Sequence, residues 1–277
     1  MPPVPEALEI RGGLADGEQL AVLASGGLDS TVLLEEALRQ GPVVPIHVGC
    51  GAFWEAAERR TLARMRRLPG FRGLGELIQL NMPTADLYGH HWSLDGRGTP
   101  DDTTADDAVY LPGRNPLLAI KPLIWCRLHG IRRLAVGTLA GNPFDDASEP
   151  FRRQFSEALS LAVGGEVELV APLGRLGKAD LVRRASRQAL AASFSCLRPQ
   201  AGRETGRHCG RCNKCGERRR AFLEAGVPDP TDYAAGHSPA SIPASIPVSV
   251  PASMPADAPA AAEAARAARP PAAPQSR

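Results

Sequence analysis

The turn between the first apolar run and the first helical pattern is the feature that most constrains this chain. Residues 25–30 read Ser-Gly-Gly-Leu-Asp-Ser, after the apolar run 20–24 and before a helical pattern over 31–40. The glycines let the backbone pass close to a ligand, and the hydroxyls of Ser25 and Ser30 can donate to phosphate oxygens. The first N–H groups of the helix are unpaired and lie at the positive end of its dipole. We therefore expect a phosphate-binding loop, the alternative being an ordinary Gly-Gly turn with a capping Ser or Asp.

The same six residues separate the main classes of phosphate-binding loop. They lack the lysine of the G-x-x-x-x-G-K-[ST] motif, so a kinase or GTPase loop is not expected. They resemble the S-G-G-x-D-S pyrophosphate loop of the N-type ATP pyrophosphatases, which cleave ATP between its α and β phosphates and adenylate a substrate. That resemblance implies that ATP is bound by Ser25, Gly26, Gly27, Leu28, Asp29 and Ser30. The glycine N–H groups and the serine hydroxyls would hold the pyrophosphate, and the aspartate would orient the loop or a Mg²⁺ ion.

Apolar runs and helical patterns alternate along the first two thirds of the chain. Strands are expected near residues 20–24, 43–48, 77–80, 133–136 and 167–171, and helices near 31–40, 54–67, 115–128 and 150–163. This alternation predicts an α/β fold with a doubly wound parallel sheet, whose ligands lie beyond the carboxyl ends of the strands. The loop resemblance implies the Rossmann-like, adenine nucleotide alpha hydrolase-like form of that fold. Residues 81–107 lack such a pattern and predict a long loop that is functional or mobile.

Composition limits the partners and the location of the protein. Its 277 residues are 43% hydrophobic, enough for a buried core, and 32 basic against 30 acidic residues leave a net charge of +2. That balance gives no overall attraction to nucleic acid or to an anionic membrane. No apolar stretch approaches the roughly 20 residues that cross a bilayer, and the N-terminus lacks the features of a secretion signal. We therefore expect a cytoplasmic protein without a membrane partner.

Four segments are predicted from these patterns. An N-terminal extension (1–18) precedes the ATP-pyrophosphatase α/β domain (19–192), a zinc-binding segment (193–236) packs on that domain, and a tail (237–277) follows. The tail is rich in Pro, Ala and Ser and poor in aromatic residues, so it cannot bury enough surface to offset the entropy of ordering. We predict that it is disordered and dispensable, with a tethering role as the alternative.

Four of the six cysteines form a compact pattern in the predicted zinc-binding segment. Their spacing is C-x12-C-x2-C-x2-C, at Cys196, Cys209, Cys212 and Cys215. Because no export signal precedes them, disulfides are disfavoured, and four thiolates suffice for a closed, structural zinc site. An iron–sulfur cluster, a redox dithiol and a nucleic-acid-binding zinc knuckle are the alternatives. Cys50 and Cys126 are predicted to be core or pocket residues, with a place in the active site as the alternative for Cys50.

A third motif lies between the long loop and the next helix. Residues 110–115 read Tyr-Leu-Pro-Gly-Arg-Asn, in which Pro-Gly fixes a turn and Asn115 can cap the helix. Taken with the Ser25 loop before it and the cysteines behind it, this ordered set closely resembles the 7-cyano-7-deazaguanine synthase family of the queuosine pathway. That family shows S-G-G-x-D-S, then V-P-G-R-N, then S-C followed by C-G-x-C-x-x-C-x-x-R. The last pattern is matched by Ser195, Cys196, Cys209, Cys212, Cys215 and Arg218.

The resemblance runs from about residue 20 to residue 222, with one departure. Residues 174–180 resemble the Leu-x-Lys-Ala-acid segment of the family, which includes Lys178. In the segment that follows the 133–136 strand, the family carries an Asp and a Gly-Tyr-Pro-Asp-Cys sequence associated with the deazapurine. This chain has Gly-Asn-Pro-Phe-Asp-Asp-Ala-Ser-Glu-Pro at 141–150, so Asp145 or Asp146 is expected to supply the acid.

The resemblance implies an ATP-dependent carbon–nitrogen ligase. In the family, 7-carboxy-7-deazaguanine is adenylated, ammonia displaces AMP to give the amide, and a second activation with dehydration yields 7-cyano-7-deazaguanine. The implied catalytic residues are Asp29, Arg114 and Lys178, and the implied substrate-binding residues are Arg114, Asn115, Asp145 and Asp146. The implied cofactors are ATP, Mg²⁺ and a structural Zn²⁺. The implied partners are small molecules, with no strong signal for nucleic acid and with a homodimer as one candidate assembly.

Other functions stay open at this point. A related enzyme would adenylate a deazapurine acid and couple it to another amine in place of ammonia. A tRNA-thiolating pyrophosphatase fits less well, since it needs a catalytic cysteine pair and a basic RNA-binding appendage. The non-enzyme alternative is a zinc-stabilised module that binds a nucleotide or RNA without catalysis. For Arg114 and Lys178 themselves, the alternatives are a surface ion pair and a solvated lysine at a helix start.

Overall fold

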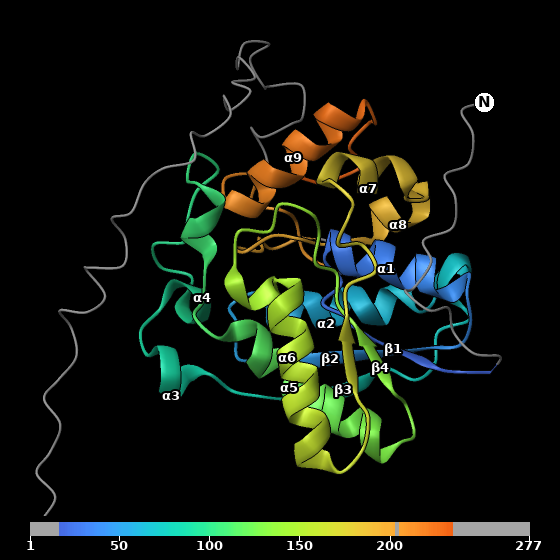
Figure 1. Ribbon diagram of the computed structural model, residues 1–277. Coiled ribbons are helices and arrows are strands. Elements are labelled where there is room, and N and C mark those ends of the chain that lie inside the picture. Colours follow the sequence, from blue (N-terminus) through green and yellow to red (C-terminus); the bar gives the residue numbers. More distant parts are fainter. Residues whose placement is uncertain (1–16, 203–204, 235–277) are drawn as a thin grey trace, which may run out of the picture. The chain divides into compact units, whose positions relative to one another are not determined.

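A computed structural model describes residues 17–202 and 205–234 (Figure 1). The predicted tail and nearly all of the predicted N-terminal extension lie outside these residues. The strands are β1 (Leu20–Leu23), β2 (Val43–Gly49), β3 (Ile78–Asn81), β4 (Arg133–Ala135) and β5 (Glu168–Val170). The helices are α1 (Leu28–Leu38), α2 (Glu55–Met65), α3 (Ala85–Tyr88), α4 (Trp92–Asp95), α5 (Arg114–Leu128), α6 (Glu149–Val163), α7 (Lys178–Arg184), α8 (Arg187–Ala192) and α9 (Asn213–Ala225).

The strands form one parallel sheet in the order β3-β2-β1-β4-β5. The predicted α/β fold with a parallel sheet is therefore confirmed. Central β1 pairs with β2, which follows it in the chain, and with β4, which the chain reaches only after β3 and α5. The strand order reverses at β1, and in such sheets a crevice for ligands opens at the carboxyl ends beside the reversal. The Ser25 turn follows β1 at that point.

The alternation of side chains along β1 explains how helices come to cover both faces of the sheet. Leu20 and Val22 are fully buried in a cluster that includes residues of α1, α2, α7, α8 and α9. Ala21, one residue out of phase, belongs to a second cluster with residues of α5 and α6. A parallel strand buried on both faces reads as a continuous apolar run, and residues 20–24 have that pattern. Figure 1 shows α5 and α6 grouped apart from α1, α7, α8 and α9.

Two regions differ from the sequence expectations. The long loop predicted over 81–107 contains the short helices α3 and α4, which at four residues each are too brief to produce a periodic pattern. The helices α8 and α9 are not among the predicted helices. At six residues α8 is too short for a periodic pattern, and α9 buries the polar residues Asn213 and Arg218 beside its apolar ones. In the described part of the chain, no helix is long and apolar enough to span a membrane.

Candidate active site and metal centre

The Ser25 turn is folded by its own hydroxyl groups. Gly26 has φ +76°, and a Cβ there would lie 2.8 Å from the Thr61 side chain on α2, so only glycine fits. The Gly27 N–H donates to Ser25 Oγ (3.2 Å), and Ser30 Oγ donates to the Gly27 carbonyl (3.2 Å). Ser25 N–H donates to Ser30 Oγ (3.3 Å), which closes the turn. The serines therefore shape the loop as well as offering hydroxyls to a ligand.

Three backbone donors of this turn are left over. The N–H of Leu28 donates to Ser195 Oγ at 3.3 Å, whereas the N–H groups of Gly26, Asp29 and Ser30 have no partner among the residues that the structure describes. These donors belong to the loop and to the first turn of α1, an 11-residue helix. Clustered free N–H groups at a helix start bind phosphate oxygens well, since the helix dipole adds to the hydrogen bonds.

Gly137, directly beyond β4, faces this turn. A Cβ at Gly137 would lie 3.2 Å from the carbonyl carbon of Asp29 and from the N atom of Ser30, so the neighbours would have to shift by a few tenths of an ångström. The sequence around Gly137 does not indicate this role, because only the pairing of β4 with β1 brings the glycine to the loop. Its missing side chain is what allows the loop to lie this close to β4.

We expect the substitution Gly137→Ala to lower ATP affinity several-fold while the fold is retained. The added methyl group would displace the free N–H groups of Asp29 and Ser30, and phosphate contacts depend on their positions. Calorimetric titration with ATP and a thermal melt would measure the two effects. Gly73→Ala is the matched control, because its Cβ would meet only the flexible end of Leu38 at 3.3 Å. Equal ATP affinities of the two variants would contradict this prediction.

Asp29 lies in a row of alternating charges. Lys178 Nζ, at the start of α7, lies 2.8 Å from each carboxylate oxygen of Asp29 and 2.8 Å from Glu217 Oε1 on α9. Lys214 Nζ lies 2.7 Å from the other oxygen of Glu217. Lys178 is 22% exposed and Asp29 31%, so water screens the row only in part. The alternative of a solvated lysine at a helix start is therefore wrong for Lys178.

The charges in this row fix the protonation of its members. Burial alone would lower the pKa of Lys178, but the carboxylates of Asp29 and Glu217 outweigh it and raise that pKa above its usual value. Burial would raise the pKa of Glu217, but Lys178 and Lys214 outweigh it and hold that pKa at about 2. Lys178 is thus a permanent cation beside the phosphate loop, whose positive charge suits a polyphosphate.

The four clustered cysteines meet in space. The sulfur atoms of Cys196, Cys209, Cys212 and Cys215 all lie within 4.8 Å of one another. Those of Cys209 and Cys215 are 4.0 Å apart, close to the about 3.8 Å that a tetrahedral zinc site with Zn–S bonds of about 2.3 Å requires. The backbone N–H groups of Leu197, Arg198, Cys209 and Arg211 donate to three of these sulfurs at 3.2–3.4 Å. Such donors stabilise thiolates, so the residues fit a divalent metal.

The cysteine segment also holds the phosphate loop in place. The N–H of Phe194 donates to the Gly26 carbonyl at 2.7 Å, and Ser195 Oγ accepts from Leu28. Arg218 is buried and donates to Ser195 Oγ (3.4 Å), to Ser193 Oγ (2.9 Å) and to a carbonyl of α8 (3.0 Å). The Ser-Cys pair and the arginine of the C-terminal motif therefore connect the metal centre to the phosphate loop.

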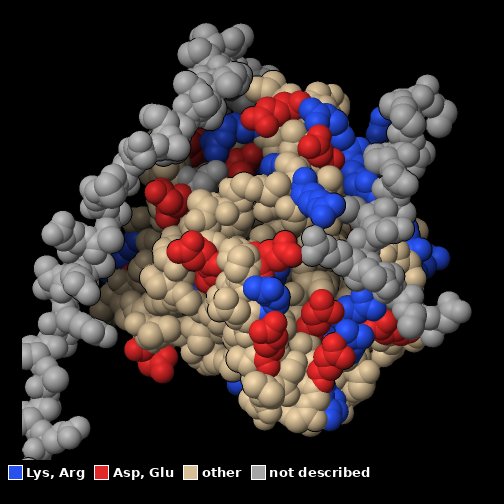
Figure 2. Space-filling model, viewed as in Figure 1, with Lys and Arg blue, Asp and Glu red and all other residues tan. Residues whose placement is uncertain are grey.

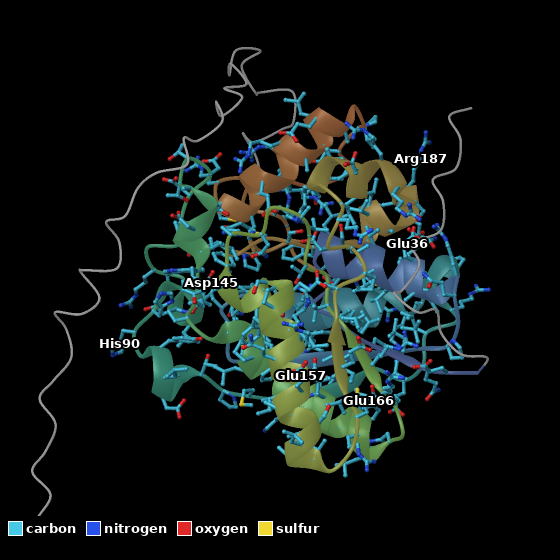
Figure 3. The ribbon with its side chains drawn as sticks, in the orientation of Figure 1. Glu36, His90, Asp145, Glu157, Glu166 and Arg187 are labelled. Atoms are coloured by element: carbon cyan, nitrogen blue, oxygen red, sulfur yellow. The ribbon has the colours of Figure 1, made fainter. Side chains whose placement is uncertain are left out.

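The middle motif forms a turn and starts a helix, but not through the predicted cap. Gly113, with φ +73°, is the N-cap of α5, so the prediction that Asn115 caps this helix is wrong. Asn115 lies inside the helix, and its N–H and Nδ2 donate to the two oxygens of Asp146 (3.2 and 2.9 Å). Asp145 is exposed, and Figure 3 labels it at the loop that precedes α6. Of the two acids, Asp146 is the one joined to the middle motif.

Arg114 borders a hollow that lies beyond β2. The hollow is lined by Cys50, Ala52, Trp54, Thr84, Tyr88, Ser93, Leu94, Leu111, Arg114, Leu117 and Leu118. Cys50 was predicted to be a core or pocket residue, and it lines this pocket. Burial raises the pKa of its thiol. The guanidinium of Arg114 has no hydrogen bond or ion pair with any residue that the structure describes. The alternative of a surface ion pair therefore does not apply within that part of the chain.

Comparisons with known proteins agree with this geometry. Residues 19–226 match the family model described as queuosine biosynthesis protein QueC. The chain is 31% identical over 226 residues to the 7-cyano-7-deazaguanine synthase of Thiobacillus denitrificans, which covers 77% of this chain and 97% of that protein. It is 32% identical over 235 residues to the enzyme of that name from Methanothrix thermoacetophila, covering 76% and 96%.

Solved structures resemble the chain more distantly. One, described as a predicted subunit of a tRNA methyltransferase from Methanocaldococcus jannaschii, has a TM-score of 0.38 and 16% identity, and covers 60% of this chain and 74% of that one. Another, a phosphoadenylyl-sulfate reductase from Candida auris, has a TM-score of 0.33 and 12% identity, with coverages of 60% and 70%.

Proposed function

Because the chain belongs to the QueC family of queuosine biosynthesis proteins, we propose that it is a 7-cyano-7-deazaguanine synthase. It converts 7-carboxy-7-deazaguanine and ammonia to the nitrile at the expense of ATP. The observation that carries this proposal is the contact between two of the sequence motifs, because Phe194 and Ser195 of the cysteine segment bond to the phosphate loop. Asn115 of the middle motif bonds to Asp146, the acid expected near the deazapurine. The reaction makes the protein a carbon–nitrogen ligase.

The first half of the reaction activates the acid. A carboxylate oxygen attacks the α phosphorus of ATP, the bond to the bridging oxygen breaks, and pyrophosphate leaves. The free N–H groups of Gly26, Asp29 and Ser30 are placed to hold that pyrophosphate, and Lys178 is placed to offset its charge. Mg²⁺ supplies further charge neutralisation when it is bound, and the Asp29 carboxylate is the candidate ligand for it in the loop. The protein positions its reactants and stabilises charge, with no covalent attachment of the substrate.

The second half forms the nitrile. Ammonia attacks the acyl carbon, loses a proton and displaces AMP to give the amide. The amide oxygen then attacks the α phosphorus of a second ATP, and loss of the two N–H protons with AMP leaves the C≡N group. We assign Arg114 to bind the carboxylate before activation, since its guanidinium has no hydrogen bond or ion pair with the described residues and it lines the hollow beyond β2. Asp146, fixed by Asn115, is an acceptor for the N–H groups of the deazapurine.

The metal centre has a structural role in this proposal. Zn²⁺ held by the four thiolates would have no open coordination position, so it supplies folding energy rather than catalysis. We further propose that the ATP-pyrophosphatase domain (19–192) and the zinc-binding segment (193–236) act as one unit, supported by the hydrogen bonds between Phe194, Ser195 and the loop.

On the face in Figure 2, acidic and basic side chains of the described residues are interspersed, in keeping with the small-molecule partners of this proposal.

Incubation with ATP, Mg²⁺ and 7-carboxy-7-deazaguanine, with and without ammonium, tests the function. We expect the nitrile with ammonium, together with two AMP and two pyrophosphate per nitrile, and an adenylate without it. Mass spectrometry of the products distinguishes the outcomes. Amide as the final product would indicate a one-step ligase. If other amines react with the adenylate and ammonium does not, the enzyme couples the acid to another acceptor. If no AMP forms, the protein is a nucleotide-binding module without this activity.

A further inference from the structure

Lysine is rare in this chain and is concentrated beside the metal centre. Of the 32 basic residues only three are lysines, Lys121, Lys178 and Lys214, and all the others are arginines. Lys178 and Lys214 both contact the carboxylate of Glu217, in the row of alternating charges that ends at Asp29. An ammonium is a compact charge with three donors that point in different directions, whereas a guanidinium is a planar fork. Lysine therefore suits a place where one cation must contact carboxylates of two separate elements.

Glu217 is held by both of its oxygens in this row. Its Oε1 lies 2.8 Å from Lys178 Nζ, and its Oε2 lies 2.7 Å from Lys214 Nζ. Lys214 stands three positions before Glu217 on α9, so the two side chains share one face of that helix. Lys178 reaches the same carboxylate from α7, which lies beside α9 (Figure 1). The carboxylate therefore cannot rotate without giving up one of its two lysines.

The family pattern gives Lys214 and Glu217 no role. In C-G-x-C-x-x-C-x-x-R, residues 214 and 217 fall on positions marked x, whereas the cysteines and Arg218 fall on fixed ones. The pair is therefore a feature of this chain for which the cysteine motif does not account.

The two carboxylates that hold Lys178 differ in their position relative to the phosphate loop. Asp29 belongs to the loop, where the free N–H groups are placed to hold pyrophosphate, whereas Glu217 lies on α9 outside it. Phosphate oxygens that enter the loop repel the Asp29 carboxylate and compete with it for the ammonium of Lys178. Among the described residues, Glu217 is then the one remaining group that holds this ammonium.

Lys214 allows Glu217 to hold Lys178 without cancelling its charge. Glu217 by itself would neutralise Lys178 and leave little attraction for a polyphosphate. With Lys214 on the other oxygen of Glu217, the three groups keep one net positive charge. A polyphosphate at the loop therefore still meets a cation, and the position of that cation is fixed.

We propose that Glu217 is a positioning residue, which holds Lys178 beside the phosphate loop when a polyphosphate displaces Asp29 from it. Lys214 is the counter-charge that keeps Glu217 in place. The inference rests on the part of the proposed function that assigns phosphate binding to the loop. It gives the cysteine segment a part in binding the phosphates, in addition to its hydrogen bonds with the loop backbone.

The rarity of lysine allows a direct test by nuclear magnetic resonance. Protein labelled with ¹⁵N in its lysine side chains should give three ammonium signals, which the variants Lys121→Arg and Lys178→Met assign. Inorganic pyrophosphate with Mg²⁺ is the probe. At saturation, the Lys178 signal of the parent should shift and stay sharp, because Glu217 still holds the ammonium. In Glu217→Gln the same signal should broaden or disappear, since an ammonium that is no longer held exchanges its protons with water quickly.

Turnover supplies a second readout. Glu217→Gln should lower kcat for AMP formation by about tenfold and raise the KM for ATP by no more than about threefold, because a misplaced Lys178 matters most in the transition state. A change of charge alone would act in the opposite direction, since removal of a carboxylate near the loop should tighten pyrophosphate binding and keep the parental kcat. Glu217→Asp, which keeps the charge on a shorter side chain, should restore part of the rate.

Glu224→Gln is the matched control, because it makes the same chemical change at an exposed position of the same helix. It should leave the ammonium signals and the rate unchanged. A Lys178 signal that stays sharp with pyrophosphate in Glu217→Gln would overturn the proposal, and so would a parental kcat in that variant. If the parent binds pyrophosphate and makes no nitrile, the proposed function fails while the titration still decides the role of Glu217.

Because Glu217 lies two residues beyond Cys215, the metal content and the thermal melt of each variant are recorded beside the titration. If Glu217→Gln loses its metal, Glu217→Asp decides by the same two readouts, because its shorter side chain cannot reach both lysines. A sharp Lys178 signal together with a parental kcat in that variant would then overturn the proposal.

Discussion

Replacement of Asp29 by Asn should abolish formation of AMP and pyrophosphate, with turnover reduced by at least about a hundredfold. Asp29 neutralises Lys178 at 2.8 Å, and without its charge the ammonium is held by Glu217 alone, on the side of the metal centre. The loop then loses both its carboxylate and the contact that keeps the lysine beside the phosphates. The change removes no apolar contact from the core, so the circular dichroism spectrum and the melting temperature should stay close to those of the parent.

A matched control lies outside all of the motifs. Glu166, just before the start of β5, is 65% exposed and pairs with Arg132 at 2.6 Å. Glu166→Gln should leave turnover unchanged, because exposed pairs of this kind contribute little to stability and this one lies at the amino ends of the strands, whereas the loop follows the carboxyl end of β1. Near-parental rates of AMP release by the Asp29→Asn enzyme would show that the loop does not need this carboxylate, and the phosphate-site assignment would be wrong.

The sheet and the loop were predictable because their signals are local. Each of the five strands lies within about one or two residues of its predicted run. The signal is clearest in the central strand β1, which is buried on both faces and apolar throughout. The Ser25 turn was predictable because Gly26 needs a positive φ that few other residues adopt. The four sulfurs were predictable as a group because their spacing is short.

The partners of the site residues were not predictable from local pattern. Asp29 and Lys178 are 149 positions apart, and only the fold brings the start of α7 to the start of α1. The place of Asn115 after Pro-Gly predicts a helix cap, but Gly113 adopts the left-handed conformation that begins the helix, and the asparagine side chain instead donates to Asp146. The hollow was missed because its walls come from four separate elements.

Removal of the metal should unfold the C-terminal segment and abolish ATP turnover together. Cys212→Ser leaves three thiolates for the ion, and in a site of this kind the free energy of metal binding is folding free energy. Phe194 and Ser195, which hold Gly26 and Leu28 of the loop, directly precede the first cysteine, so they lose their support with the metal. We expect the melting temperature of Cys212→Ser to fall by about 10 °C or more and its ATP binding to weaken even where the sheet stays folded.

The control and the metal assay make this prediction specific. Cys126 is also fully buried but lies on α5 outside the cluster, so Cys126→Ser should lose some stability, keep its metal and melt with the same sensitivity to a chelator as the parent. Metal analysis should find about one zinc per chain in the parent and in Cys126→Ser, and much less in Cys212→Ser. A brown protein that absorbs visible light would indicate that the cysteines hold an iron–sulfur cluster instead of zinc. A metal-free protein with the parental melting temperature and the parental ATP affinity would overturn the structural role, because the thiolates would then do nothing for the segment that supports the phosphate loop.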